Sequence, residues 1–518
     1  MSEKRIRFNI WALLLAGYTS VVGTIFAFLN MFDEAPLLIL FFIGCLSVLY
    51  FVFYFLFILF GKIKFCSKPI TSKRGKWLVF SGATLACLVI TMLWYIAFKP
   101  GSFYADSIVQ YGQACSGEYS DWHPALHTLL FFTLPIKIFG SVEGIMLLQV
   151  IYFSLIIGYM FETISEFIGV KQAILTFLYI LLNPYVCQIM TYPYKDVAFA
   201  MAGLLALIMI FRLYYTNGRW GNSAYKVILL GVVIIAATIF RHNAVLFTAP
   251  LAIGGLLLLK KKQKINLIIS MFVTFVIIKC VVYNIVGVSK PGNRVSELVG
   301  VPLTVMGNVV KETPEKMDDE LSAYVYSIAP QNEWEEYYEC GNFNAFKFTE
   351  LGDLSIVDEK GAFYALKMMG KCFAASPKAS FEALFSLTDI VYGFNTGSEG
   401  SVRYSIFPNT LGIKYSGNSD LKIFFTTYCN LLDGSIFRYL RTYGVVILIM
   451  LFVVFARLDL KNKKSFYNLL PLAPVFIYDF GTMLLLTGPD SRFFFVTLLV
   501  APIVILWAMY KRQEERAV

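Results

Sequence analysis

The stretch KPGSFYADSIVQYGQACSGEYSDWHPALH (residues 99–127) interrupts a chain that is otherwise dominated by apolar residues. It follows an apolar run long enough to cross a membrane and contains two of the three histidines, His123 and His127. It also carries two aspartates, Asp106 and Asp121. Its position predicts a polar loop at a membrane surface, and the remaining sequence decides which other polar segments meet it.

The composition identifies the class of protein. Of the 518 residues, 58% are hydrophobic and only 15% are charged, with a mean hydropathy of +0.67. Soluble domains carry about 25% charged residues, so this chain has too much apolar surface to hide from water. The composition therefore predicts an all-α polytopic membrane protein.

Repeated apolar runs have the length and composition of membrane-spanning helices. Twelve such helices are predicted, at residues 10–31, 37–60, 77–98, 142–162, 172–190, 197–215, 225–240, 244–259, 265–288, 436–456, 467–487 and 493–510. With the N-terminal tail in the cytoplasm, 24 Lys and Arg residues fall in cytoplasmic segments. The short external loops hold only five: Lys99, Lys137, Lys195, Arg241 and Arg492. This positive-inside pattern predicts cytoplasmic termini and explains the net charge of +10 without nucleic-acid binding.

The predicted helices divide the chain into four parts. Residues 1–60 form two additional N-terminal helices, and residues 61–288 form a membrane core that includes a first external loop, 99–141. Residues 289–435, between helices nine and ten, contain 19 of the 34 acidic residues and are predicted to be extracytoplasmic. Residues 436–518 hold the last helices and the C-terminal tail.

The polar segment 289–435 is long enough either to bury a modest core of its own or to form a cap on the membrane domain. Helical periodicity is present at 360–373 and 378–393, on either side of Ser376-Pro377. Lys and aromatic residues share both stretches, which is typical of helices that lie on a membrane surface. The Gly-, Asn- and Ser-rich run 395–419 is predicted to be a loop.

The predicted topology places five short polar motifs on the external side. These are KPGSFYADS (99–107), SDWHPALH (120–127), YPYKD (192–196), RHN (241–243) and GPDSR (488–492). They include all three histidines, four aspartates and, besides Lys99, three basic residues: His123, His127, His242, Asp106, Asp121, Asp196, Asp490, Lys195, Arg241 and Arg492. Charges at helix ends that face a protein interior are functional candidates by default.

These residue types suit one kind of chemistry. Arg and Lys match a phosphate, a carboxylate can take a proton from an attacking hydroxyl or hold a divalent cation, and histidine can move protons. The sequence has no GxxxxGK[ST] motif and no strand-placed GxGxxG motif for ATP. A site beside the bilayer with these groups favours transfer from a donor already activated on a lipid.

The phrases PGSFYADSIVQYGQA, DWHPALHTLL, NPY…YPYKDVAFA, FRHNAVL and GPDSRFFF resemble the GT-C superfamily of multi-pass membrane glycosyltransferases, in particular uncharacterised bacterial members. The resemblance covers residues 77–510, with two additional helices in front. It implies inverting transfer of a sugar from a polyprenyl-phosphate donor to a cell-envelope acceptor, at the outer face of the bacterial plasma membrane. Asp106 matches the acid of the first external loop, as general base or as a ligand of Mg²⁺ or Mn²⁺. That loop often carries paired acids, whereas Asp106 stands between Ala105 and Ser107.

We therefore assign three groups of site residues. Asp106, His123 and Asp196 are candidate catalytic residues, and Lys195, Arg241 and Arg492 are candidates for phosphate binding. The supporting residues are Asp121, His127, His242, Asp490, Lys279 and Asp479.

Each assignment has a structural alternative. Asp106 could cap the helix that begins at Ser107, and the arginines could anchor helices to lipid headgroups. His123 and His127 have the four-residue spacing of zinc ligands, but no HExxH glutamate or third ligand accompanies them, so no metal site is predicted from them.

Lys279 and Asp479 lie at a similar depth, about 12 Å from the external ends of their helices. Their opposite charges predict a buried ion pair, or a lysine that reaches the donor phosphate. A rival interpretation is a multi-pass transporter that uses these two residues for coupling. A third is an envelope polysaccharide polymerase or ligase, which shares the lipid-linked donor.

Overall fold

The computed structural model describes residues 9–63, 68–292, 295–394 and 404–510. Within these residues the regular structure is helical, and β-structure is limited to isolated bridges. The prediction of an all-α protein is confirmed. The basic segments predicted at the two chain ends (2–7 and 511–516) lie outside the described residues.

Seven helices among the described residues are long and apolar enough to cross a membrane. They are α1 (Ile10–Asn30), α2 (Ala35–Lys62), α3 (Lys73–Phe98), α7 (Glu143–Phe167), α10 (Lys195–Tyr215) and the continuous segments Lys261–Val286 and Ser491–Met509. The second-last segment comprises α13 (Lys261–Val276), a π-helical stretch (Ile277–Val282) and α14 (Tyr283–Val286). The last comprises the 3-10 turn η10 (Ser491–Phe494) and α25 (Phe495–Met509). The chain is therefore a polytopic α-helical membrane protein.

The other five predicted spans also form helices, but each has only 12 to 17 residues. They are α8 (Val170–Leu182), α11 (Ala224–Phe240), α12 (Val245–Leu258), α23 (Tyr443–Phe455) and α24 (Leu472–Met483). A perpendicular span needs about 20 apolar residues, so the structure does not by itself show twelve spans. The predicted helix 172–190 is divided because Asn183 caps α9 (Pro184–Ile189) and Pro184 begins it.

The first loop is itself helical. It contains α4 (Ala105–Ser116) and a second helical run formed by α5 (Ala125–Thr128), a π-helical stretch (Leu129–Thr133) and α6 (Leu134–Phe139). This second run begins directly after Pro124. It supplies a helix next to the membrane core that is too short for a full span.

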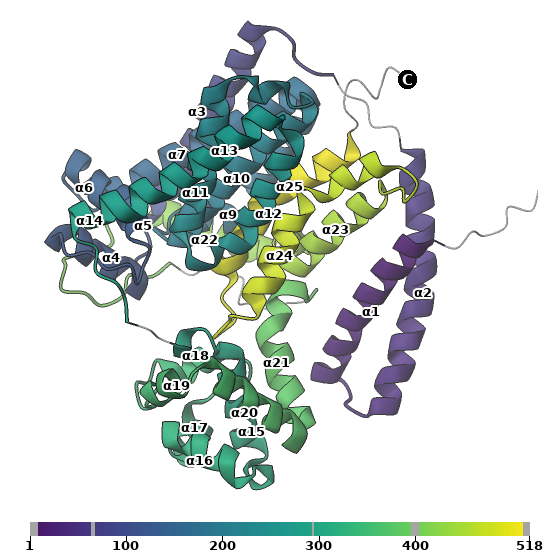
Figure 1. The fold of residues 1–518 in the computed structure, drawn as a ribbon, viewed down its shortest axis with the longest axis vertical. Helices are drawn as coiled ribbons and strands as arrows, with labels where there is room; N and C mark the ends of the chain where they lie inside the picture. Colours follow the sequence, from purple (N-terminus) through teal and green to yellow (C-terminus); the bar gives the residue numbers. More distant parts are fainter. Residues whose placement is uncertain (1–8, 64–67, 293–294, 395–403, 511–518) are drawn as a thin grey trace, which may run out of the picture.

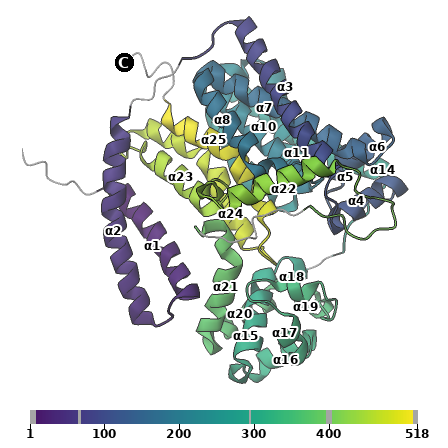
Figure 2. The same ribbon diagram turned by 180° about the vertical axis from the view of Figure 1, so that it is seen from behind.

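Helix α10 is the centre of the membrane core (Figure 1). It packs against α7, α11, α12 and α25. In an 18-residue apolar stretch of α10, 89% of the residues are buried, whereas the corresponding fraction in α2 is 6%. The α1–α2 hairpin lies to one side of the core in both views (Figures 1 and 2). A central α10 matters for the site because its first turn carries Lys195 and Asp196.

Residues between 295 and 384 bury a hydrophobic core of their own, separate from the membrane core and built around Trp334 and Tyr338. Its helices are α15 (Gly300–Glu312), α16 (Asp319–Ile328), α17 (Gln331–Tyr337), α18 (Phe343–Lys347), α19 (Ser355–Lys360), α20 (Ala362–Ala375) and the first part of α21 (Pro377–Tyr392). These helices form a distinct group at one end of the membrane core, and α21 runs back towards α23 and α24 (Figure 1). The predicted helix break at Ser376-Pro377 is confirmed.

After α21, the described chain resumes at residue 404 and pairs with the first loop. The Phe103 amide donates to the Ser405 carbonyl (2.9 Å), and the Phe407 amide donates to the Phe103 carbonyl (2.9 Å). The Ser416 amide donates to the Lys99 carbonyl at 2.9 Å. Helix α22 (Ser419–Asp433) follows and crosses the end of the core transverse to α21 and α2 (Figure 2).

Candidate functional site

Residues from all five polar motifs meet at one end of α10. We call Asp106, His123, Lys195, Asp196, Arg241 and Arg492 the rim cluster. Asp106 lies in the first turn of α4, and Lys195 and Asp196 lie in the first turn of α10. The junction of α11 with α12 and the turn before α25 supply the two arginines. Carboxylates in the first turn of a helix are stabilised by the helix dipole, which favours both aspartates at these positions.

The carboxylate of Asp106 faces two cations. Its Oδ2 atom lies 3.5 Å from Nζ of Lys195 and 3.7 Å from Nη2 of Arg492. These distances are longer than a tight ion pair at about 2.7–2.9 Å, and the Asp106 side chain is 30% exposed. Helix α4 begins at Ala105 and receives no side-chain cap, so the alternative role of Asp106 as a helix cap is wrong.

The charges around Asp106 set its ionisation. Burial alone would raise the pKa of the carboxyl, but Lys195, Arg492 and His123 together hold this pKa well below its usual value of 3.8. Asp106 is therefore ionised at neutral pH in the substrate-free protein.

His123 is a neutral neighbour of this ion pair. Its side chain is buried, with 5% of the residue exposed, and Nδ1 lies 3.3 Å from Nζ of Lys195. A lysine ammonium only donates hydrogen bonds, so Nδ1 accepts and the proton of the neutral ring is on Nε2. Burial, reinforced by Lys195, lowers the pKa of His123 to about 4. The ring thus presents an N–H donor at neutral pH.

Asp196 and Arg241 form a buried ion pair beneath the exposed part of the cluster. Asp196 is 2% exposed and Arg241 is 7% exposed. The guanidinium also stacks on the Phe493 ring, 4.4 Å from its centroid, and donates through Nε to Asn243. The buried Asp196 carboxylate also faces the second arginine, because its Oδ2 atom lies 3.9 Å from Nε of Arg492. Asp196 therefore orients both arginines.

Arg492 is held from two sides. Its Nε atom lies 2.7 Å from Oδ2 of Asp490, and its guanidinium carbon lies 4.6 Å from the centroid of the Tyr194 ring. Asp490 also accepts a hydrogen bond from the Arg492 amide at 3.1 Å. Stacking of this kind fixes the planar guanidinium while leaving its N–H groups available to an anion.

The predicted pair of Lys279 with Asp479 is wrong. Nζ of Lys279 lies 2.6 Å from Oδ2 of Asp121 and 4.4 Å from the centroid of the Tyr283 ring. Asp479 is fully buried, and the single hydroxyl of Thr497 donates to its carboxylate, with Oγ1 2.8 Å from both oxygens. Lys279 belongs to the π-helical stretch after α13, and its side chain turns towards the first loop instead of α24.

Asp121, His127 and His242 each have a hydrogen-bond partner in the first loop. Asp121 accepts from the Ala125 amide at 3.1 Å and so fixes the start of α5, two residues after His123. His127 is fully buried; its Nδ1 lies 2.9 Å from Nε2 of Gln110. His242 is exposed, with Nε2 3.3 Å from the Trp122 carbonyl oxygen.

The charged groups do not form a divalent-cation site. Within the described ranges, no group of three or more His, Cys, Asp and Glu side chains is placed to hold a metal ion. Asp106, the candidate ligand, instead faces Lys195 and Arg492. Two cations against one carboxylate do not fit Mg²⁺ or Mn²⁺, which prefer several oxygen ligands.

Two features of the site are not signalled by the sequence motifs. Tyr194 lies inside the YPYKD motif, but its role as the platform for Arg492 depends on folding. The pairing of Ser102 with Ser405, through a hydrogen bond of 2.7 Å from Oγ to the carbonyl oxygen, joins segments 303 residues apart. No local pattern in the sequence signals that contact.

Compared with known proteins, the chain matches no family model, no curated protein and no solved structure.

Proposed function

We propose that this protein is a glycosyltransferase that transfers a sugar from a polyprenyl-phosphate donor to a hydroxyl group of a cell-envelope acceptor. The observation that carries the proposal is that the partly exposed carboxylate of Asp106 faces two cations, Lys195 at 3.5 Å and Arg492 at 3.7 Å. A phosphate leaving group needs the cations, and an attacking hydroxyl needs the carboxylate.

In the proposed reaction, the acceptor oxygen attacks the anomeric carbon of the donor sugar. A new carbon–oxygen bond forms as the bond from the anomeric carbon to the phosphate oxygen breaks, with inversion at that carbon. The electron pair leaves with the phosphate, and the proton of the acceptor hydroxyl passes to Asp106. Lys195 and Arg492 stabilise the charge that develops on the phosphate, and the Nε2–H group of His123 donates to a substrate oxygen.

Donor binding also activates the base in this proposal. A carboxylate whose pKa is held far below neutral is a weak base. The donor phosphate competes for Lys195 and Arg492, the same cations that lower the pKa of Asp106. Asp106 becomes more basic when the donor is bound, so proton abstraction is coupled to occupancy of the donor site.

The proposal includes a setting for the reaction. We propose that the chain crosses a bacterial plasma membrane twelve times, in a GT-C-like arrangement with both termini in the cytoplasm. The rim cluster then lies at the outer face of the membrane. The positive-inside pattern of the loops supports this orientation. The residues between 295 and 384, which have a hydrophobic core of their own, then form an extracytoplasmic cap. The cap contacts the segment that precedes Arg492, because the backbone amide of Asn344 donates to the Thr487 carbonyl at 3.1 Å.

A polysaccharide polymerase or ligase is the nearest alternative, because it uses the same cluster with a glycan on a lipid diphosphate. The transporter alternative relied on Lys279 and Asp479 as a coupled pair, and these residues have separate partners.

The test uses purified protein in lipid nanodiscs with labelled polyprenyl-phosphate sugars and a panel of envelope acceptors. Asp106→Asn is expected to lower turnover by about 10²–10⁴-fold, because the general base is lost. Glu118→Gln, an exposed change in the same loop, serves as the matched control and is expected to leave turnover unchanged. Equal turnover of Asp106→Asn and wild type would remove Asp106 from the role. Turnover only with lipid-diphosphate glycans would favour the polymerase.

A further inference from the structure

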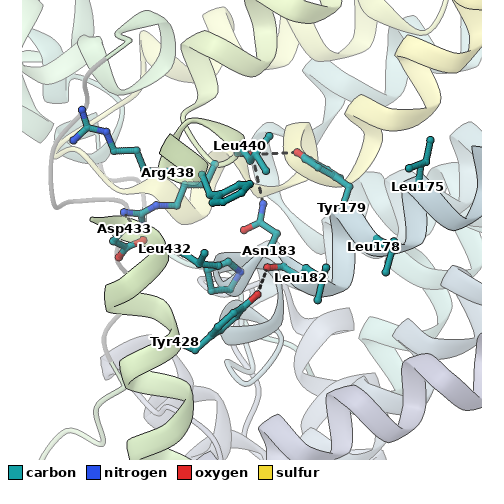
Figure 3. Close-up of a pocket in the computed structure, with 13 residues that line it drawn as sticks. Leu175, Leu178, Tyr179, Leu182, Asn183, Tyr428, Leu432, Asp433, Arg438 and Leu440 are labelled. Carbon is teal, nitrogen blue, oxygen red and sulfur yellow. Dashed lines mark hydrogen bonds and ion pairs between the residues drawn. The ribbon is translucent and has the colours of Figure 1, made fainter. Parts of the chain in front are cut away.

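A groove of about 330 Å³ opens on the side of the membrane core, between α8, α22 and the 3-10 turn Ile436–Leu440 (Figure 3). Leu175, Leu178 and Leu182 of α8 form one wall. Their spacing places them on one helix face, and they are 59%, 43% and 56% exposed. Such exposure of large apolar side chains in a membrane helix indicates contact with lipid chains.

The opposite end of the groove is charged (Figure 3). Arg438 is exposed there, and Nη2 of Arg441 lies 2.9 Å from Oδ1 of Asp433. Two arginines against one aspartate leave one excess positive charge. The sugar-loaded carrier is a phosphodiester with one negative charge, and the sugar-free carrier is a phosphomonoester with at least one. The charged end therefore complements the phosphate of either form, while the leucine wall complements the apolar chain.

The helix that closes the groove has the character of an interfacial helix. Helix α22 lies transverse to α21 and α2 (Figure 2) and exposes Ile423, Phe424 and Leu431, each by more than 60%. An amphipathic helix in this orientation lies at the boundary between headgroups and acyl chains. The groove is therefore at the depth where a lipid phosphate meets its chain.

Hydrogen bonds connect the groove to the rim cluster. At the groove end, Tyr179 and Asn183 donate to the Leu440 carbonyl at 3.3 and 3.5 Å. Three residues later, the Tyr443 hydroxyl donates to the Ser491 carbonyl at 2.6 Å, and Tyr185 donates to Oγ of Ser491 at 3.0 Å. Ser491 immediately precedes Arg492, so these hydrogen bonds and the short backbone segments between them link the end of the groove to the proposed donor-phosphate site.

We propose that this groove binds the polyprenyl phosphate carrier of the sugar donor, with its isoprenoid chain along α8 and its phosphate at Arg438 and Arg441. The inference rests on the proposed function for the identity of the lipid. It assigns the route by which the carrier passes between the bilayer and the rim cluster, which the catalytic residues themselves leave open.

The experiment measures binding of polyprenyl phosphate, without sugar, to the full-length protein in phosphatidylcholine nanodiscs. Arg438→Gln removes the exposed charge, and Leu178→Trp fills the groove. Each is expected to raise the dissociation constant by about tenfold, as the loss of one charge-assisted contact or of the apolar wall predicts. In turnover assays both are expected to raise KM for the donor with kcat unchanged.

Matched controls separate the groove from general effects. Arg74→Gln removes an exposed arginine elsewhere, and Leu229→Trp enlarges a leucine of α11 that is 48% exposed; both are expected to bind as wild type. Thermal unfolding in detergent verifies that each variant is folded. Wild-type affinity in both groove variants would overturn the inference, as would equal displacement of polyprenyl phosphate by phosphatidylglycerol.

The two proposals fail in different ways. If wild type binds polyprenyl phosphate through the groove but transfers no sugar, the groove assignment stands and the glycosyltransferase proposal falls. If Asp106→Asn abolishes transfer while the groove variants keep wild-type affinity and KM, only the groove assignment falls.

Discussion

The ammonium of Lys195 lies 3.5 Å from the carboxylate of Asp106 and joins the first turn of α10 to the first turn of α4. Lys195 also donates to His123 at 3.3 Å. The same ammonium therefore controls the ionisation of both candidate proton-transfer groups. Any anion that draws Lys195 away changes both.

The pH dependence of catalysis follows from this arrangement. In the proposed mechanism Asp106 acts as a base only when ionised, so activity is expected to fall as the pH falls through its pKa. In the free enzyme Lys195 and Arg492 hold that pKa low, whereas the donor phosphate occupies these cations in the complex. The acidic limb of kcat is therefore expected at higher pH than that of kcat/KM, because these parameters report the bound and free enzyme respectively.

Lys195→Met gives the matched measurement. Loss of the ammonium raises the pKa of Asp106 in the free enzyme and is expected to move the acidic limb of kcat/KM upwards, towards that of kcat. Coincident limbs in the wild type would contradict the proposed competition between Asp106 and the phosphate.

The buried pair of Asp196 and Arg241 predicts a loss of stability when one partner is removed. Asp196→Asn leaves the buried Arg241 guanidinium without its counter-charge and is expected to cost about 3–5 kcal/mol. The double variant Asp196→Leu, Arg241→Met is expected to recover most of that loss, since well-packed apolar residues often replace a buried ion pair without cost. Thermal unfolding in detergent measures both, with Glu118→Gln as a control expected within about 0.5 kcal/mol.

A double-mutant cycle tests the partner of Lys279. Lys279→Met and Asp121→Asn are expected to show a coupling energy of about 0.5–3 kcal/mol, because the two side chains are in contact. Lys279→Met and Asp479→Asn are expected to be additive within about 0.5 kcal/mol. Strong coupling between Lys279 and Asp479, with none between Lys279 and Asp121, would instead support the ion pair predicted from the similar depth of Lys279 and Asp479.

The sequence predicts much of the helical framework because the hydrophobic runs and the helices have the same physical origin. Each of the twelve predicted runs contains a helix. The division of the predicted helix 172–190 at Asn183-Pro184 has a local cause, because proline restricts the residue before it and is favoured at the start of a helix. The hydrophobic pattern does not show this division, since apolar residues continue on both sides of it.

The convergence of the rim cluster was predictable for a related reason. Loops that connect consecutive spanning helices alternate between two faces, so Asp106, Lys195, Arg241 and Arg492 fall on one face whenever the helix count is correct. Their distances and partners depend on how the helices pack, which the alternation does not determine.

The partner of Lys279 could not be predicted from its position along the helix. Counting residues along a helix gives a depth, but the direction of a side chain depends on rotation about the helix axis. The π-helical stretch Ile277–Val282 alters that rotation locally, and Lys279 turns to Asp121. Asp479 then satisfies its carboxylate with Thr497, a neighbour on α25 that the charge pattern does not reveal.

The pairing of Phe103 with Ser405 and Phe407 has a consequence for how the protein is made. Ribosomes synthesise the chain from the N-terminus, so the first loop is in place long before residues 405–407 exist to pair with it. Arg492, the last member of the rim cluster, follows later still. At about 5–20 residues per second, the first loop waits tens of seconds for its partners. A nascent chain that has not reached residue 492 therefore holds Asp106 without Arg492, and the rim cluster is complete only after that residue has been synthesised.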